Sequence, residues 1–194
     1  MSKESKVNFT IGTIGDARHG KTALLATILD LQASKGLADG LANRGLIELD
    51  EPKQVIVAEY ESDDHYYTHI DCPGSEEYNE KMAANMARMD GAILVVSVPD
   101  GVTPQTREHV RLAYEAGIRT IVAYMNKADI LDDEEWHDLA VDDTCKLLSE
   151  HGFYEPDIVS YGSAMAARMG ELSKMDKIDE LIQALDRGIS AQEG

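Results

Sequence analysis

The chain has 194 residues, which is enough for one domain with a sizeable core and short for two. Its 36 acidic and 18 basic residues give a formal net charge of −18, which argues against a broad RNA- or DNA-binding surface, because such surfaces neutralise phosphates with Lys and Arg. The sequence has no apolar run of about 18 residues, no signal-peptide pattern at its start and only two cysteines, so we expect a cytoplasmic protein without a membrane span or a disulfide framework.

The first half of the chain predicts a strand, a helix, a long loop and a pair of strands. The β-branched alternation over residues 7–14 indicates a buried strand, and residues 22–32 have the apolar spacing of a helix. Residues 33–53 are rich in Gly, Asp and Pro and predict a long mobile loop. The strings QVIVAEYE and YYTHID (54–61 and 66–71) indicate two strands joined by a short turn.

The second half of the chain alternates helices with strands. The continuous apolar run GAILVVSV (91–98) is typical of a central parallel strand, and Pro104 begins a helix. Strands that alternate with helices predict an α/β fold, with a mostly parallel sheet of about six strands and helices on both faces. A ligand of such a sheet lies beyond the C-terminal ends of its strands, where each motif below falls. The remaining helices are expected over 76–88, 133–150 and 174–187, and the remaining strands within 119–129 and 157–164.

The string GDARHGKT (15–22) fits Gly-x-x-x-x-Gly-Lys-Thr, the phosphate-binding P-loop. Its glycines let backbone N–H groups approach phosphates that a Cβ would block. Lys21 would reach the β- and γ-phosphates, the Thr22 hydroxyl would ligate Mg²⁺, and the following helix directs its positive end at the anion. The nucleotide-binding residues expected in this loop are Asp16, Ala17, Arg18, His19, Gly20, Lys21, Thr22 and Ala23.

Asp71 and Gly74, in the string DCPG (71–74), are the expected partners of the P-loop. Asp71 ends a predicted strand and is the natural second group for Mg²⁺, as in other P-loop nucleotide hydrolases. Gly74 would let a backbone N–H approach a γ-phosphate. The predicted metal ligands are therefore Thr22 and Asp71.

The string NKAD (126–129) is expected to determine which nucleotide base the protein binds. The Asp129 carboxylate can accept hydrogen bonds from N1–H and the 2-amino group of guanine. Adenine has an acceptor at N1 and no 2-amino group, so it would leave a buried carboxylate unpaired. We expect Asn126 to brace the loop and Lys127 to cover the ring.

A second base-binding stretch is GSAM (162–165), although a plain strand-to-helix turn explains this string equally well in isolation. It would supply Ser163, Met165 and the Ala164 N–H, which we expect to donate to the guanine oxygen. The motifs together predict GTP or GDP as the ligand and Mg²⁺ as the cofactor.

With these motifs in order, the chain resembles the G domain of the translational GTPases, that of elongation factor Tu most closely. The resemblance runs from about residue 7 to residue 185 and is densest in DCPG, GSAM, MDGAILVVSVPDGVTPQTREHV (89–110) and NKADILDDEE (126–135). It implies the P-loop GTPase fold and a GTP-dependent switch. It also leads us to expect a single GTP-binding (G) domain over residues 1–194, without the family's two β-barrel domains, which help to hold aminoacyl-tRNA.

Ser75 departs from the family, which has His at this position to orient the attacking water. A hydroxyl can hold a water, but it is shorter than imidazole and does not titrate near neutral pH. The candidate catalytic residues of this chain are Ser75, Gly74 and Arg18. With serine in this place, we expect slow hydrolysis.

Arg18 replaces an acid that the family commonly has beside the phosphates. Its guanidinium could supply positive charge like an arginine finger in cis, or it could face solvent or pair with Asp16.

The switch loop also departs from the family pattern, because RGLIELDEP (44–52) stands where the family supplies a threonine to Mg²⁺. A water or a carboxylate such as Glu48 or Asp50 would take the place of that threonine.

Two functions follow from these motifs. The first is a slow or partner-stimulated GTPase, which converts GTP to GDP and phosphate; the alternative is a non-hydrolysing GTP/GDP-binding module that acts through contacts with an unknown protein effector. Residues 129–157 carry eleven acids and one basic residue, Lys146, which indicates either a solvated helix face or a docking face for a basic partner. Four further residues are expected to be structural, namely Met82, Met86, Met89 and His109.

Overall fold

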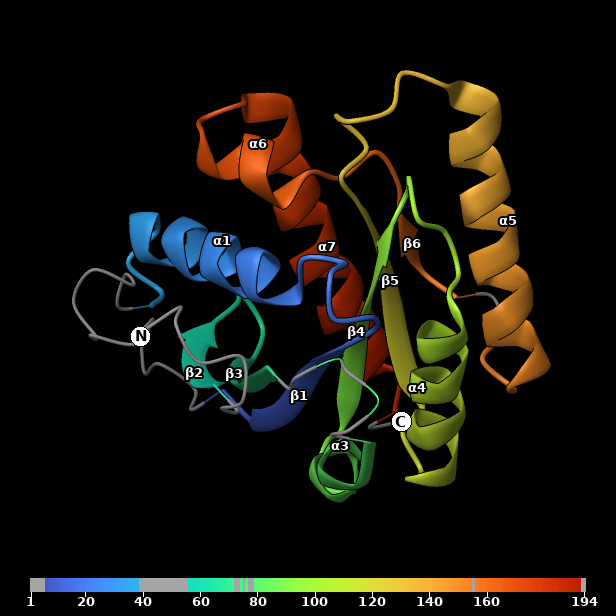
Figure 1. Ribbon diagram of the computed structural model, residues 1–194. Coiled ribbons are helices and arrows are strands. Elements are labelled where there is room, and N and C mark those ends of the chain that lie inside the picture. The colour runs from blue at the N-terminus through green and yellow to red at the C-terminus, as the bar shows by residue number, and fades with distance from the viewer. Residues whose placement is uncertain are drawn as a thin grey trace.

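The computed structural model describes residues 6–38, 56–71, 74, 76, 79–154 and 156–192, and its helices lie on both faces of a six-stranded sheet (Figure 1). The strands are β1 (Asn8–Ile14), β2 (Ile56–Glu61), β3 (Tyr66–Asp71), β4 (Gly91–Ser97), β5 (Thr120–Asn126) and β6 (Ile158–Val159). The helices are α1 (Lys21–Ser34), α3 (Asn79–Met86), α4 (Pro104–Glu115), α5 (Glu134–Glu150), α6 (Ala164–Arg168) and α7 (Leu172–Ser190).

The sheet has the strand order β2-β3-β1-β4-β5-β6. β2 is antiparallel to β3, and the other paired strands run parallel. The pairing of β1 with β3 brings Thr13 beside Asp71, so the ends of these two strands lie at the same edge. The predicted α/β fold, with a mostly parallel six-stranded sheet and helices on both faces, is therefore confirmed.

The elements differ from the expected ones mainly at their ends. α3 is shorter than the helix expected over residues 76–88, and α7 is longer than expected. The sequence analysis did not predict α6, which begins where the Ser163 hydroxyl accepts a hydrogen bond from the Ala166 N–H at 3.1 Å. Of the loop expected over 33–53, the part from residue 39 onward lies outside the described residues.

Two apolar cores enclose the sheet, one on each face. α1, α6 and α7 cover one face, towards which β4 directs Ile93 and Val95, and α3, α4 and α5 cover the other, towards which it directs Leu94 and Val96. Because alternate side chains of a strand point to opposite faces, β4 and β5 are buried at every position and read as continuous apolar runs. The second core contains three methionines that we expected to be structural, Met82, Met86 and Met89.

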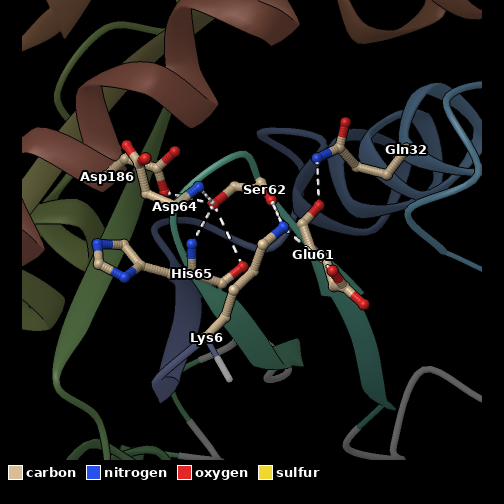
Figure 2. Close-up of polar contacts among 7 residues, drawn as sticks. All are labelled: Lys6, Gln32, Glu61, Ser62, Asp64, His65 and Asp186. Atoms are coloured by element: carbon tan, nitrogen blue, oxygen red, sulfur yellow. Dashed lines mark hydrogen bonds and ion pairs between the residues drawn. The ribbon is translucent and has the colours of Figure 1, made fainter. Parts of the chain in front are cut away.

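A polar cluster fastens the turn between β2 and β3 to two helices (Figure 2). Asp186 of α7 accepts hydrogen bonds from the Ser62 hydroxyl and from the Tyr67 hydroxyl, both at 2.7 Å. Gln32 of α1 donates to the Glu61 carbonyl at 2.5 Å. The four side chains that make these hydrogen bonds are all buried, so the cluster holds the hairpin in place from within the fold.

No helix in the described part of the chain is long and apolar enough to cross a membrane.

We predict that Asp186→Ala destabilises the protein more than Asp186→Asn does at pH 7. Alanine leaves the Ser62 and Tyr67 hydroxyls without their acceptor, at a cost of about 1–3 kcal/mol. The asparagine oxygen can still accept both hydrogen bonds. Urea unfolding of the two variants measures the difference in the free energy of unfolding, and equal values would contradict the prediction.

The pH dependence of the same comparison tests how Asp186 is ionised. Burial raises the pKa of this carboxyl above its ordinary value, against the opposing effect of the hydrogen bonds from Tyr67 and Ser62. The folded protein therefore takes up a proton more readily than the unfolded chain, and stability is lost as the pH rises through the raised pKa. As the pH is lowered from 7 through this range, the free energy of unfolding of the wild type should rise relative to that of Asp186→Asn. A difference between the two free energies that stays constant with pH would refute this.

Candidate functional site

Four predicted motifs meet at the C-terminal edge of the parallel strands. The Gly15–Thr22 loop follows β1, Gly74 lies beyond β3, residues 126–129 follow from the end of β5, and residues 163–165 lie beyond β6. The strands alone would bring these segments near one another. Hydrogen bonds then join them across large sequence separations, as the contacts below show.

The phosphate loop closes around the Lys21 ammonium group. Lys21 is 4% exposed, and its Nζ donates to the Gly15 carbonyl at 3.1 Å and to the Asp16 carbonyl at 2.8 Å. Gly20 has a φ of 92°, a conformation that side chains with a Cβ rarely adopt, which explains the glycine at this position. A buried positive charge at the N-terminus of α1 suits an anionic ligand such as phosphate.

Thr22 and Asp71 form a hydrogen-bonded pair where α1 begins and β3 ends. The Thr22 hydroxyl donates to Asp71 Oδ2 at 2.6 Å, and the Thr13 hydroxyl donates to Oδ1 at 2.5 Å. Burial raises the pKa of Asp71, while these two hydrogen bonds and the charge of Lys21 oppose the increase. A carboxylate and a hydroxyl so close together fit Mg²⁺, which prefers oxygen ligands.

A metal ion at this pair would need further ligands from outside the protein. The described residues contain no group of three or more His, Cys, Asp or Glu side chains that could hold a metal ion. Mg²⁺ is commonly bound through one or two protein groups together with water and the phosphates of a substrate. The predicted ligands Thr22 and Asp71 match that pattern.

Gly74 lies so close to the phosphate loop that only glycine fits. A Cβ at this position would lie 2.1 Å from Lys21 Nζ, 2.6 Å from the Gly15 carbonyl oxygen and 2.7 Å from the Ala17 nitrogen. Gly74 therefore meets the phosphate loop directly. Ser75 lies outside the described residues, and its catalytic role stays a prediction.

His109, which we expected to be structural, supports the phosphate loop. Its Nδ1 accepts a hydrogen bond from the Gly15 N–H at 3.0 Å, which requires a neutral ring. Burial, together with the charge of Lys21, lowers the pKa of His109 to about 4. Thr103 adds a second support by donating to Asp16 Oδ2 at 2.9 Å. These contacts span 94 and 87 positions, so no local sequence signal could have revealed them.

The side chains of the phosphate loop differ in their exposure and in their contacts. Arg18 is exposed, and its guanidinium forms no ion pair with any described residue, which fits the solvent-facing alternative; its arginine-finger role stays a prediction. His19 is 1% exposed, with Nδ1 3.2 Å from the Val95 carbonyl oxygen, so it contributes to a ligand site only through its backbone. Ala17 is exposed, and Ala23 is half-buried in the first turn of α1.

Asn126 connects the phosphate loop to the second base-binding stretch. Its Nδ2 donates to the His19 carbonyl, and its Oδ1 accepts from the Ala164 N–H, both at 2.9 Å. This is the bracing contact that the sequence analysis expected of Asn126. It also occupies the Ala164 N–H, so the expected donation from Ala164 to a guanine oxygen stays a prediction that requires this hydrogen bond to be shared or broken.

The other base-binding candidates differ in how open they are to a ligand. Lys127 donates from Nζ to the Arg18 carbonyl at 2.7 Å, which holds it against the phosphate loop. The Asp129 side chain is exposed and open to a ligand. The Ser163 hydroxyl caps α6 and is 1% exposed, whereas Met165 is 56% exposed. The base-reading role of Asp129 stays a prediction.

A comparison with protein families agrees with this arrangement. The family model described as "Elongation factor Tu GTP binding domain" matches residues 6–191 of the 194. The matched range contains the phosphate loop, the Thr22–Asp71 pair, Gly74 and both base-binding stretches. The resemblance to the translational GTPases and the P-loop GTPase fold are thereby confirmed.

We predict that Gly74→Ala weakens GTP binding. The added Cβ would collide with Lys21 Nζ and with the phosphate-loop backbone, and overpacking of this kind costs about 1–3 kcal/mol. Titration with a fluorescent GTP analogue should show a loss of about 5- to 150-fold in affinity. Gly117→Ala is a control for the same substitution away from the site, because its Cβ meets no atom within 4 Å. Its positive φ of 89° means that it should cost stability through backbone strain without changing nucleotide affinity. Equal affinities in both variants would contradict the prediction.

Proposed function

Because the chain belongs to the family of elongation factor Tu GTP-binding domains, we propose that it is a GTPase that hydrolyses GTP slowly on its own and faster with a partner protein. Membership of this family makes it a GTP-binding protein of the GTPase class. The observation that carries the proposal is the Thr22–Asp71 hydrogen bond of 2.6 Å beside the buried Lys21. These are the groups that phosphoryl transfer needs, assembled at one point.

Each of these residues has a distinct part in the proposed reaction. Lys21 would neutralise charge on the phosphates, and the Gly74 N–H would donate to a γ-phosphate oxygen, a role supported by the closeness of Gly74 to Lys21 Nζ and to the phosphate loop. Thr22 and Asp71 would hold Mg²⁺, which, when bound, neutralises the phosphate charge and orients the phosphate oxygens. The protein's contribution is therefore a fixed arrangement of positive and donor groups around the transferred phosphoryl group.

We propose that GTP hydrolysis is slow because of Ser75 and because of the switch loop. A serine hydroxyl holds a water less rigidly than an imidazole, and loss of one such positioning group costs about 100- to 1,000-fold in rate without abolishing turnover. The switch-loop carboxylates Glu48 and Asp50 lie outside the described residues, and a role for them at Mg²⁺ stays a prediction. The net charge of −18 supports a basic protein as the stimulating partner.

We expect Asp129→Asn to change which base the protein prefers. Asparagine can no longer accept two hydrogen bonds from N1–H and the 2-amino group of guanine, but its amide can donate to the 2-oxygen of xanthine. GDP affinity should fall by about 100-fold or more, and binding of xanthosine diphosphate should appear, both measured by calorimetry. Asp132→Asn removes an exposed acid nearby and serves as the control. Unchanged GDP affinity in Asp129→Asn would overturn the assignment of the base.

A single-turnover assay tests hydrolysis itself. Nucleotide-free protein with excess Mg²⁺ and substoichiometric GTP should accumulate GDP above a protein-free control over hours. Ser75→His should raise this rate, and Arg18→Ala should lower it while sparing GDP binding if Arg18 acts on the transition state. If bound GTP stays intact over the same period, the protein is instead a non-hydrolysing nucleotide-binding module that acts through protein contacts.

A further inference from the structure

A histidine of α5 holds the residue that leads into the second base-binding stretch. His137 Nε2 accepts a hydrogen bond from the Tyr161 N–H at 3.1 Å. The two rings are also stacked, with centroids 3.7 Å apart and an angle of 4° between their planes. His137 is 3% exposed and Tyr161 is 44% exposed, so the Tyr161 ring covers the buried histidine at the protein surface, one residue before Gly162.

Tyr161 needs such support because of its backbone conformation. Its φ is 58°, and among the described residues only Lys127 is another non-glycine residue with a positive φ. An aromatic residue in the left-handed region is strained and persists only where its surroundings fix it. Lys127 lies in the first stretch predicted to read the base, and Tyr161 lies directly before the second. The Ala128 N–H joins the two stretches by donating to the Gly162 carbonyl at 3.0 Å.

The hydrogen bond requires His137 to be neutral, with its hydrogen on Nδ1. A protonated imidazole has two donors and cannot accept the Tyr161 N–H. Three groups face the ring: the Tyr161 phenol ring, the Asp138 carboxylate 3.9 Å from Nδ1, and Lys174, whose Nζ donates to the Tyr161 carbonyl at 2.9 Å. Burial lowers the pKa of His137, the Asp138 carboxylate opposes this and the Lys174 charge adds to it.

We propose that His137 is a positioning residue for the guanine site, which holds Tyr161 and the following residues 162–165 in the conformation that retains the nucleotide. Loss of its acceptor nitrogen, by substitution or by protonation, then speeds nucleotide release. This inference rests on the proposed function, because it concerns the same nucleotide site. It adds a residue of α5 that neither the phosphate motif nor the base motifs contain.

The test measures release of a fluorescent GDP analogue by the full chain with Mg²⁺. His137→Phe keeps a ring for the stack but lacks the acceptor, and one lost hydrogen bond corresponds to release that is about 3- to 10-fold faster. Release from the wild type should also become faster as the pH is lowered from 8 towards 5, and His137→Phe should lose this pH dependence. His151→Phe makes the same change at the end of the same helix, where the ring Nδ1 lies 2.9 Å from the Leu147 carbonyl oxygen, so it should release GDP as the wild type does.

Two outcomes decide the proposal. If His137→Phe releases GDP at the wild-type rate and with the wild-type pH profile, the proposal is wrong, because a positioning role requires both to change. If His137→Phe does not fold, Tyr161→Ala removes the stacked ring from the other side and keeps a Cβ at the strained position. Faster release is then expected, and wild-type release would likewise reject the proposal.

A separate measurement distinguishes this proposal from the function on which it rests. If the wild type binds no guanine nucleotide, the proposed function fails, and hydrogen exchange of the Tyr161 amide in nucleotide-free protein then decides the role of His137. Faster exchange in His137→Phe than in the wild type supports the proposal that His137 holds Tyr161 and residues 162–165 in place. Equal exchange in the two proteins overturns it.

Discussion

The arrangement of the site depends on the two hydrogen bonds that the side-chain amide of Asn126 makes. It satisfies the buried His19 carbonyl and the Ala164 N–H at once, which requires one donor and one acceptor on a short side chain. Aspartate offers only acceptors and leucine offers neither, so both would leave a backbone group unpaired. Because one side chain makes both hydrogen bonds, it fixes the phosphate loop relative to the base-binding stretch.

The charge distribution explains how so acidic a protein can hold a polyanion. With a net charge of −18, the surface as a whole repels phosphate, and attraction must come from within the site. Lys21 is enclosed by backbone carbonyls at the N-terminus of α1, where its charge and the helix dipole act together. His109 beside it stays neutral because a second cation there would cost free energy, and it serves as an acceptor for the loop.

The sequence was most informative where local pattern and function coincide. Continuous apolar runs identified β4 and β5, and the phosphate motif correctly joined a strand to a helix. The sequence missed α6, because a helix of five residues is too short to show an apolar periodicity. It also could not reveal the acceptor role of His109 or the left-handed Tyr161, because each depends on a partner far along the chain. The same reason hid the pairing of the Ala164 N–H, which is set by a side chain 38 positions away. Tertiary contacts decided these features, and no periodicity encodes them.

The Asp186 cluster has a mechanical consequence for the opposite end of the same hairpin. Tyr67 and Ser62 are fastened to α7, so β2 and β3 cannot slide along β1 without breaking two buried hydrogen bonds. Asp71, at the far end of β3, therefore sits on an anchored strand. A change of ligand at Asp71 therefore acts on a side chain whose strand is held in place, and the hairpin itself is a stationary frame for it.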